Sequence, residues 1–101
     1  MKKEEMIMTE PKVRAILEDI VTLLLKKNQD YGNASFDLGL NGNMVHLWDK
    51  IKRFRTFVER SQSSSDKPNF ESIEDTLRDI IGYGIIGLLI SDHEKPAARK
   101  E

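Results

Sequence analysis

The sequence contains no cysteine and only two histidines, His46 and His93. The absence of cysteine excludes disulfides, thiolate metal sites and cysteine nucleophiles within these 101 residues. Two imidazoles are too few for a zinc site that relies on several histidines. Positive charge is not in excess either, because 16 basic and 17 acidic residues give a formal net charge of −1. A general nucleic-acid binder normally carries a basic excess, so we expect no direct binding to nucleic acid.

Long apolar runs are also scarce. The first five residues, Met-Lys-Lys-Glu-Glu, lead into only a few apolar residues, which lack the long apolar core of a signal peptide. The longest apolar run, residues 80–90, would span roughly 16 Å as a helix, about half of a bilayer core. We therefore expect a cytoplasmic protein that does not enter a membrane.

Three amphipathic stretches predict an all-α fold. Thr9 is suited to cap the first helix, Pro11 is tolerated in its first turn, and Gly32 ends it. In each stretch the apolar residues recur at helical spacing and form one stripe. The three helices are expected at about residues 10–29, 43–60 and 69–91. The stripes are Val13, Ile16, Leu17, Ile20, Leu23 and Leu24; then Met44, Leu47, Trp48, Ile51, Phe54 and Val58 on the buried side of the second helix; then Phe70, Ile73, Leu77, Ile80, Ile81 and Leu88.

Two segments rich in helix breakers separate the three helices. Residues 32–43 hold three glycines and three asparagines and are expected to form a loop. Residues 61–67 form a polar linker with four serines. A chain of this length has room for one domain, which we expect over residues 1–94, followed by a disordered charged tail at 95–101.

The end of the third helix is apolar on nearly every side between residues 80 and 90. A helix that is apolar all round must be buried all round. Gly82, Gly84 and Gly87 would each cost about 1 kcal/mol against alanine, so they imply close approach by neighbouring helices. Two other helices of the same chain cannot easily surround this segment. The sequence therefore predicts a helical bundle completed by self-association, as a dimer or a tetramer.

Acidic residues on the third helix form a candidate metal site. Asp75 and Asp79 are four residues apart and share a face with Glu71. A divalent cation would relieve their mutual repulsion, and Mg²⁺ typically takes one or two carboxylates together with substrate phosphates. Two structural interpretations compete with this one. Ser72 and Asp75 have the spacing of a variant capping box, and Arg78 is placed to neutralise Asp75.

The polar side of the second helix carries His46, Asp49 and Arg53, with Lys50 beside them. Asp49 is a candidate third metal ligand, while the three basic side chains are candidates for binding phosphates. The alternative is a solvated helix face on which Asp49 pairs with Arg53 at a spacing of four residues.

The end of the first helix is the third candidate region. Asp30 and Tyr31 come directly before Gly32 and the long loop at 32–43, and loops of that length are often binding loops. Tyr31 is suited to stack on a base and Lys27 to neutralise a phosphate. Equally, Gly32 would be an ordinary C-cap and the neighbouring lysines would interact with the helix dipole.

Three blocks of sequence resemble the signature blocks of the nucleotide-modification-associated domain 1 family of phages and bacteria. The blocks are residues 27–33 (KNQDYGN), 46–50 (HLWDK) and 71–83 (ESIEDTLRDIIGY). The resemblance extends over about residues 12–90 and implies a role in phage or bacterial nucleotide metabolism.

The same blocks are more distantly similar to the all-α nucleoside triphosphate pyrophosphohydrolases of the MazG and dimeric dUTPase type. Those enzymes are helical-bundle oligomers that hold Mg²⁺ with a Glu-x-x-Glu pair and a Glu-x-x-Asp pair. Asp79 is similar to the closing Asp, but Thr76 stands where the Glu is expected, and the first pair finds only His46 and Asp49. Residues implied by this resemblance are Asp49, Asp75 and Asp79 as metal ligands, Glu71 as a fourth group or base, Lys27, Lys50 and Arg53 at phosphates, and Tyr31 or Tyr83 at the base.

These features together predict a Mg²⁺-dependent nucleotide-binding protein, which as an enzyme would hydrolyse nucleoside triphosphates or modified nucleotides. Metal-assisted attack of water on phosphorus would be the mechanism. Two alternatives stay open: a non-catalytic nucleotide-binding or regulatory module, and a structural helical oligomer that docks on another protein. The metal site requires Asp49 to come within reach of Asp75 and Asp79, in one chain or across two.

Overall fold

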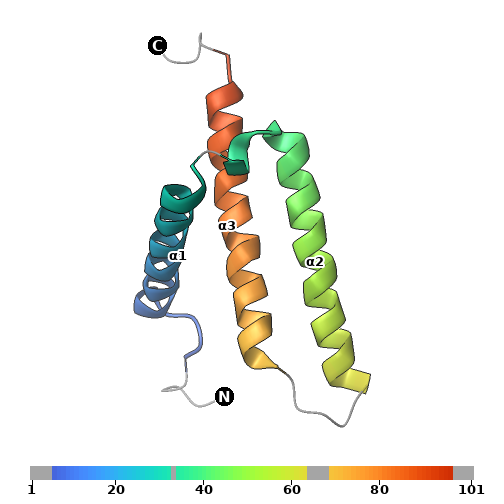
Figure 1. Cartoon of the computed structure of the whole chain (residues 1–101). Helices are drawn as coiled ribbons and strands as arrows, with labels where there is room; N and C mark the ends of the chain where they lie inside the picture. Colours follow the sequence, from blue (N-terminus) through green and yellow to red (C-terminus); the bar gives the residue numbers. More distant parts are fainter. Residues whose placement is uncertain (1–5, 33, 64–68, 97–101) are drawn as a thin grey trace. The chain divides into compact units, whose positions relative to one another are not determined.

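The computed structural model describes residues 6–32, 34–63 and 69–96. Three long helices, α1 (Glu10–Tyr31), α2 (Gly39–Ser63) and α3 (Phe70–Glu94), are joined by a short 3-10 helix, η2 (Ala34–Phe36) (Figure 1). These described residues contain no strand, which confirms the all-α prediction. The chain divides into two compact units, Met1–Gly32 with α1 and Asn33–Glu101 with the other helices. Each unit is described by itself.

The ends of α1 follow the sequence signals. Thr9 has an extended backbone, and its hydroxyl accepts a hydrogen bond from the Lys12 backbone N–H at 3.3 Å. Pro11 lies in the first turn. Gly32 ends the helix with φ +63° and ψ −137°, a conformation that is open mainly to glycine, and donates its N–H to the Asn28 carbonyl at 2.7 Å. The predicted N-cap and C-cap are confirmed, with α1 two residues longer than expected.

The prediction of a loop over residues 32–43 is wrong for most of that segment. It contains η2, and α2 already begins at Gly39 rather than near Asn43. Glycine and asparagine disfavour helix by propensity, but tertiary contacts override propensity here. The 3-10 helix packs against both α2 and α3, and Gly42 is buried and donates its N–H to the Leu38 carbonyl at 3.2 Å.

Helices α2 and α3 lie side by side and antiparallel in the second unit (Figure 1). Asn69 caps α3, because its side-chain oxygen accepts the Ser72 N–H at 3.0 Å. The alternative in which Asp75 caps this helix is therefore wrong. Three residues of the predicted linker at 61–67 belong to α2, and the rest lie outside the described residues. The same holds for most of the predicted tail at 95–101, where only Lys95 and Pro96 are described.

Helices α2 and α3 approach each other closely where Asn43 meets Gly87. Asn43 is buried and its side-chain amide donates to the Tyr83 carbonyl at 2.8 Å. A Cβ added at Gly87 would lie 2.5 Å from the Asn43 side-chain oxygen, so the predicted close approach holds at this glycine. At Gly84, by contrast, an added Cβ would meet nothing within 4 Å.

The predicted buried side of α2 is only partly correct. Leu47, Phe54 and Val58 are half-buried, whereas Met44, Trp48 and Ile51 are 60%, 65% and 47% exposed. Helix α3 packs along one edge of this stripe, where Asn43 and Lys50 lie, and does not cover the other edge. The apolar end of α3 is also buried on one side only. Ile86 and Ile90 are buried, whereas Leu88 and Leu89 are exposed.

None of the described helices is long and apolar enough to cross a membrane. The expectation of a single domain over residues 1–94 and that of self-association stay predictions.

Candidate functional site

Two polar contacts cross the seam between α2 and α3 on successive turns. Lys50 of α2 places its ammonium nitrogen 3.4 Å from a carboxylate oxygen of Asp79 on α3. One turn away, the rings of His46 and Tyr83 stack with centroids 4.8 Å apart and planes inclined by 8°. His46 and Lys50 are four residues apart on α2, and Asp79 and Tyr83 are four residues apart on α3. The aromatic pair and the ion pair are therefore neighbours along the seam.

The Lys50–Asp79 ion pair is half-buried. The two side chains are 21% and 23% exposed, so bulk water and salt screen their attraction less than that of a surface pair. The positive charge of Lys50 compensates the negative charge of Asp79, so the partly buried carboxylate is not left without a partner. The sequence selected both residues, Lys50 for a phosphate and Asp79 for a metal, but did not predict that they contact each other.

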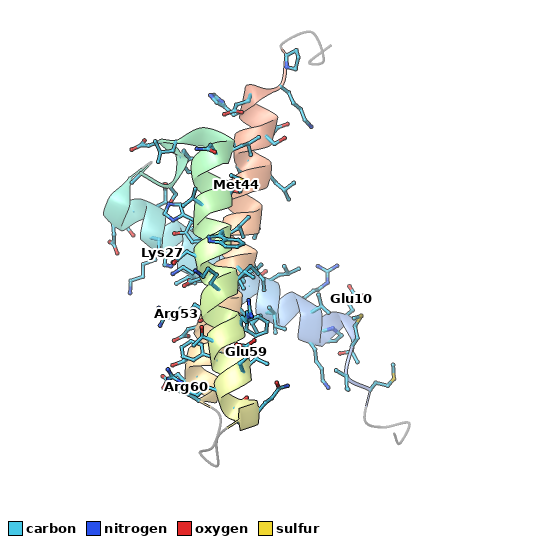
Figure 2. All side chains as sticks on the ribbon, turned by 90° about the vertical axis from the view of Figure 1, so that its right-hand side faces the viewer. Glu10, Lys27, Met44, Arg53, Glu59 and Arg60 are labelled. Atoms are coloured by element: carbon cyan, nitrogen blue, oxygen red, sulfur yellow. The ribbon has the colours of Figure 1, made fainter. Side chains whose placement is uncertain are left out.

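Arg53 lies one turn beyond Lys50, about midway along α2, as Figure 2 shows. Its guanidinium carbon sits 5.5 Å from the centre of the Phe57 ring, a cation–π distance. The Arg53 side chain is exposed, so its N–H groups are accessible to solvent and to ligands. Asp49 is also exposed.

The acidic residues of α3 are not equivalent. Asp75 accepts a hydrogen bond from Arg78 at 3.1 Å, and Glu74 lies 3.7 Å from the same guanidinium. Asp75 is 68% exposed and Glu71 is exposed, whereas Asp79 is in the seam. The interpretation in which Arg78 neutralises Asp75 is confirmed.

No ready-made metal cage is present in the part of the chain that the structure describes. There, no group of three or more histidine or acidic residues lies close enough together to hold a metal ion. Thr76, which stands where the predicted similarity to pyrophosphohydrolases would require a carboxylate, is buried, and its hydroxyl donates to the Ser72 carbonyl at 2.8 Å. Metal binding by Asp49, Asp75 and Asp79, with Glu71 as a further group, stays a prediction.

The predicted residues at the end of the first helix belong to the other compact unit. Lys27 and Asp30 lie in the last turns of α1, and Figure 2 labels Lys27 there. The side chain of Tyr31 lies outside the described residues. The roles of these three residues at a phosphate or a base stay predictions.

Asn43, which lies in the seam, and Phe57, which contacts Arg53 within α2, were not selected from the sequence. The sequence does not indicate a role for Asn43, because it lies among glycines and asparagines that predict a loop. Phe57 fell outside the expected apolar stripe of α2. Its spacing of four residues from Arg53 was the available signal, since residues four apart on a helix are neighbours.

A comparison with protein families identifies the family of this chain. The family model described as nucleotide modification associated domain 1 matches residues 27–90, which include both contacts across the seam. The chain belongs to this family. Every candidate residue lies within the nucleotide-modification-associated domain, from Lys27 at its first position to Tyr83 in α3. Searches of curated proteins and of solved structures gave no match.

Proposed function

We propose that this member of the nucleotide-modification-associated domain 1 family binds a nucleoside phosphate, together with Mg²⁺, at the polar edge of the α2–α3 seam. The observation that carries the proposal is the position of the Lys50–Asp79 ion pair one turn from the His46–Tyr83 stack. A cation, a carboxylate and two flat rings at one place are the groups that a phosphate, its metal ion and a base require.

Lys50 and Arg53 are the phosphate-binding residues in this proposal. They lie three residues apart on α2, and Arg53 is exposed. Lys50 holds Asp79 in the free protein at a distance of 3.4 Å and would exchange this carboxylate for a phosphate oxygen when the ligand binds. The exchange keeps Lys50 paired with an anion throughout, so no uncompensated charge is left at the seam.

Asp79 is the residue best suited to hold the metal ion. Mg²⁺ binds through one or two carboxylates and keeps its other ligands from phosphates and water, so a complete protein cage is unnecessary. In this proposal Asp79 supplies that carboxylate, and Asp49, Asp75 and Glu71 are further acids on the same two helices. When bound, such an ion neutralises phosphate charge and makes its bound water more acidic.

His46 and Tyr83 are the base-binding residues. Their stacked rings present a flat aromatic surface within one turn of Lys50, and base–aromatic stacking contributes about 1–3 kcal/mol per base. Stacking accepts any base, so these two rings favour nucleotides as a class over one particular base.

Binding is better supported than hydrolysis. Asp79 is paired with Lys50, and Asp75 is paired with Arg78. The position at which the similarity to pyrophosphohydrolases would require a further carboxylate is occupied by the buried Thr76. A general base must be held close to the attacking water, and Glu71 is exposed rather than held in the seam. Hydrolysis by this protein is a second outcome that the same experiment measures.

A titration of the full chain with Mg²⁺ and a panel of canonical and modified nucleotides tests the proposal. We expect the melting temperature to rise with nucleotide plus Mg²⁺, since a ligand at a hundred times its Kd stabilises the native state by about 2.7 kcal/mol. Chromatography of the nucleotide after incubation detects turnover. Turnover that disappears with EDTA would add hydrolysis to binding.

Matched variants locate the site. Lys50→Gln and Asp79→Asn should abolish the ligand-dependent rise, whereas Lys52→Gln and Glu74→Gln, which remove the same charges from the same helices, should retain it. An unchanged melting temperature with every nucleotide and metal tested, or equal losses in the control variants, would refute the proposed site.

A further inference from the structure

Asn43 is a buried polar residue of α2 that contacts α3 at the residue carrying one ring of the stack. It is 5% exposed, and its side-chain amide donates to the backbone carbonyl of Tyr83 at 2.8 Å. Burying an amide costs free energy unless its polar atoms have partners, and an apolar side chain at this seam would avoid that cost. The hydrogen bond to Tyr83, whose ring meets His46, indicates what the amide does there.

The Asn43 amide lies against one full turn of the α3 backbone. Its nitrogen binds the carbonyl of Tyr83, and its oxygen lies beside Gly87, where an added Cβ would be 2.5 Å away. Residues 83 and 87 are one helical turn apart, because an α-helix pairs each carbonyl with the N–H four residues later. Both ends of the amide therefore touch the turn that begins at Tyr83, and Gly87 leaves the room that this contact needs.

The hydrogen bond and the aromatic stack form a closed set of contacts between the two helices. Asn43 and His46 are three residues apart on α2 and so are neighbours on its surface. Asn43 binds the backbone of Tyr83, and His46 contacts the ring of the same residue. All of these residues belong to the second compact unit, so their contacts do not depend on α1. Lys50 lies seven residues from Asn43, two turns away.

We propose that Asn43 is a positioning residue for base binding, which holds the Tyr83 ring on the His46 ring before a nucleotide arrives. This inference rests on the proposed function, in which the two rings bind the base. Tyr83 is half-buried and His46 is exposed, so the ring that Asn43 holds supports the one that is open to a ligand. Two rings from different helices form one surface only while the helices stay aligned, and a surface formed in advance spares the ligand the cost of ordering it.

Proton NMR of the free full chain tests whether Asn43 holds the stack. His46 and His93 are the only histidines, and His93 is exposed in the last turn of α3, so it is an internal reference. Protons over the face of an aromatic ring are shifted upfield, so the neutral His46 imidazole should resonate upfield of that of His93. Asn43→Ala and Gly87→Ala, which disturb the contact from opposite helices, should each move the His46 signals toward the His93 position.

Calorimetric titrations test whether the held stack serves base binding. The two probes are inorganic phosphate and the nucleotide of the panel that raises the melting temperature most, each with Mg²⁺. Asn43→Ala should raise the Kd of the nucleotide by about fivefold or more, a loss within the range of one base–aromatic stack. The Kd of inorganic phosphate should stay unchanged, because Lys50 and Arg53 are retained and phosphate makes no use of the rings.

Two control variants separate positioning from a general loss of stability. Gly84→Ala makes the same change on α3 as Gly87→Ala, but its Cβ meets nothing within 4 Å, so the His46 signals and both Kd values should stay as in the wild type. Asn69→Ala removes the cap of α3 and lowers stability away from the stack, and it should also leave them unchanged.

Three results would overturn the inference: an unchanged His46 shift in Asn43→Ala, equal losses of nucleotide and phosphate affinity, or the same changes in Asn69→Ala. A wild-type protein that binds no nucleotide would instead refute the proposed function, and the role of Asn43 in base binding with it. The two failures are distinguishable, because the His46 shift is measured without any ligand.

Discussion

The ion pairs described above and those along single helices form two groups that differ in position. Lys50 and Asp79 join two helices across a seam, and both are more than three-quarters shielded from water. Arg14–Glu10, Arg55–Glu59 and Arg78–Asp75 each join neighbouring turns of a single helix on exposed surface. In the second group Glu59 accepts a hydrogen bond from Arg55 and, with its charge, raises the pKa of that guanidinium. The Lys50–Asp79 pair depends on the packing of two helices, whereas the other pairs form within one helix. Lys50 and Asp79 are therefore expected to contribute both to stability and to the proposed ligand binding.

The largest expected effect is at the contact between Asn43 and Gly87 in the seam. Gly87→Ala should destabilise the protein by about 1–3 kcal/mol, because the new Cβ would lie 2.5 Å from the Asn43 side-chain oxygen. Urea unfolding measures the change. In an Asn43→Ala background the obstructing atoms are absent, so the same substitution should become neutral or stabilising. Equal losses in both backgrounds would show that Asn43 is not the obstacle.

The second-largest loss of stability is expected at the Lys50–Asp79 ion pair across the seam. Asp79→Asn should cost about 1–2 kcal/mol, a value between those of fully buried and fully exposed pairs, because Lys50 loses its charged partner in a half-buried place. A double-mutant cycle with Lys50→Gln isolates the coupling. A coupling energy near zero would place this pair with the surface pairs and remove the distinction between the two groups.

The cap of α3 lies on the exposed surface but should still contribute more than the surface ion pairs. Asn69→Ala should cost about 1 kcal/mol, because the Ser72 N–H loses its 3.0 Å acceptor. Thermal unfolding followed by circular dichroism measures the loss. Asn69→Ser keeps a side-chain oxygen at the cap and should retain most of the stability, so a loss as large as that of Asn69→Ala would contradict the capping role.

The smallest effect is expected at the surface pair on α3. Arg78→Gln should change the free energy of unfolding by only a few tenths of a kcal/mol, since Arg78 and Asp75 are 40% and 68% exposed and screened by water. Comparison of urea unfolding at low and high salt provides the check. A loss as large as that of Asp79→Asn would mean that exposure does not separate the two groups.

The sequence predicts the fold class, the three helices and both ends of α1, because these depend on local signals such as Thr9 and Gly32. It fails between residues 32 and 43, where propensity favours a loop but contacts with α2 and α3 stabilise helix. It also assigns Met44 and Ile51 to the buried side of α2. Periodicity identifies an apolar stripe, but which edge of the stripe receives a neighbour depends on how two helices pack.

The candidate site shows the same limit. Lys50, Asp79, His46 and Tyr83 could each be selected from residue type and from the resemblance to a family. Their pairing could not, because 29 residues separate Lys50 from Asp79 and the alignment of two helices decides which residues meet. Asn43 was missed for a related reason, since its role appears only when Gly87 lies opposite.

The contact between Asn43 and Gly87 has a consequence for which polar residues become neighbours. If α2 slid along α3 by one helical turn in either direction, Asn43 would face Tyr83 or Ser91, whose side chains occupy the space that Gly87 leaves free. The present alignment is the one that also sets His46 on Tyr83 and Lys50 on Asp79. Gly87, which has no side chain, thus fixes the alignment of the two helices and with it the contacts of His46 with Tyr83 and of Lys50 with Asp79.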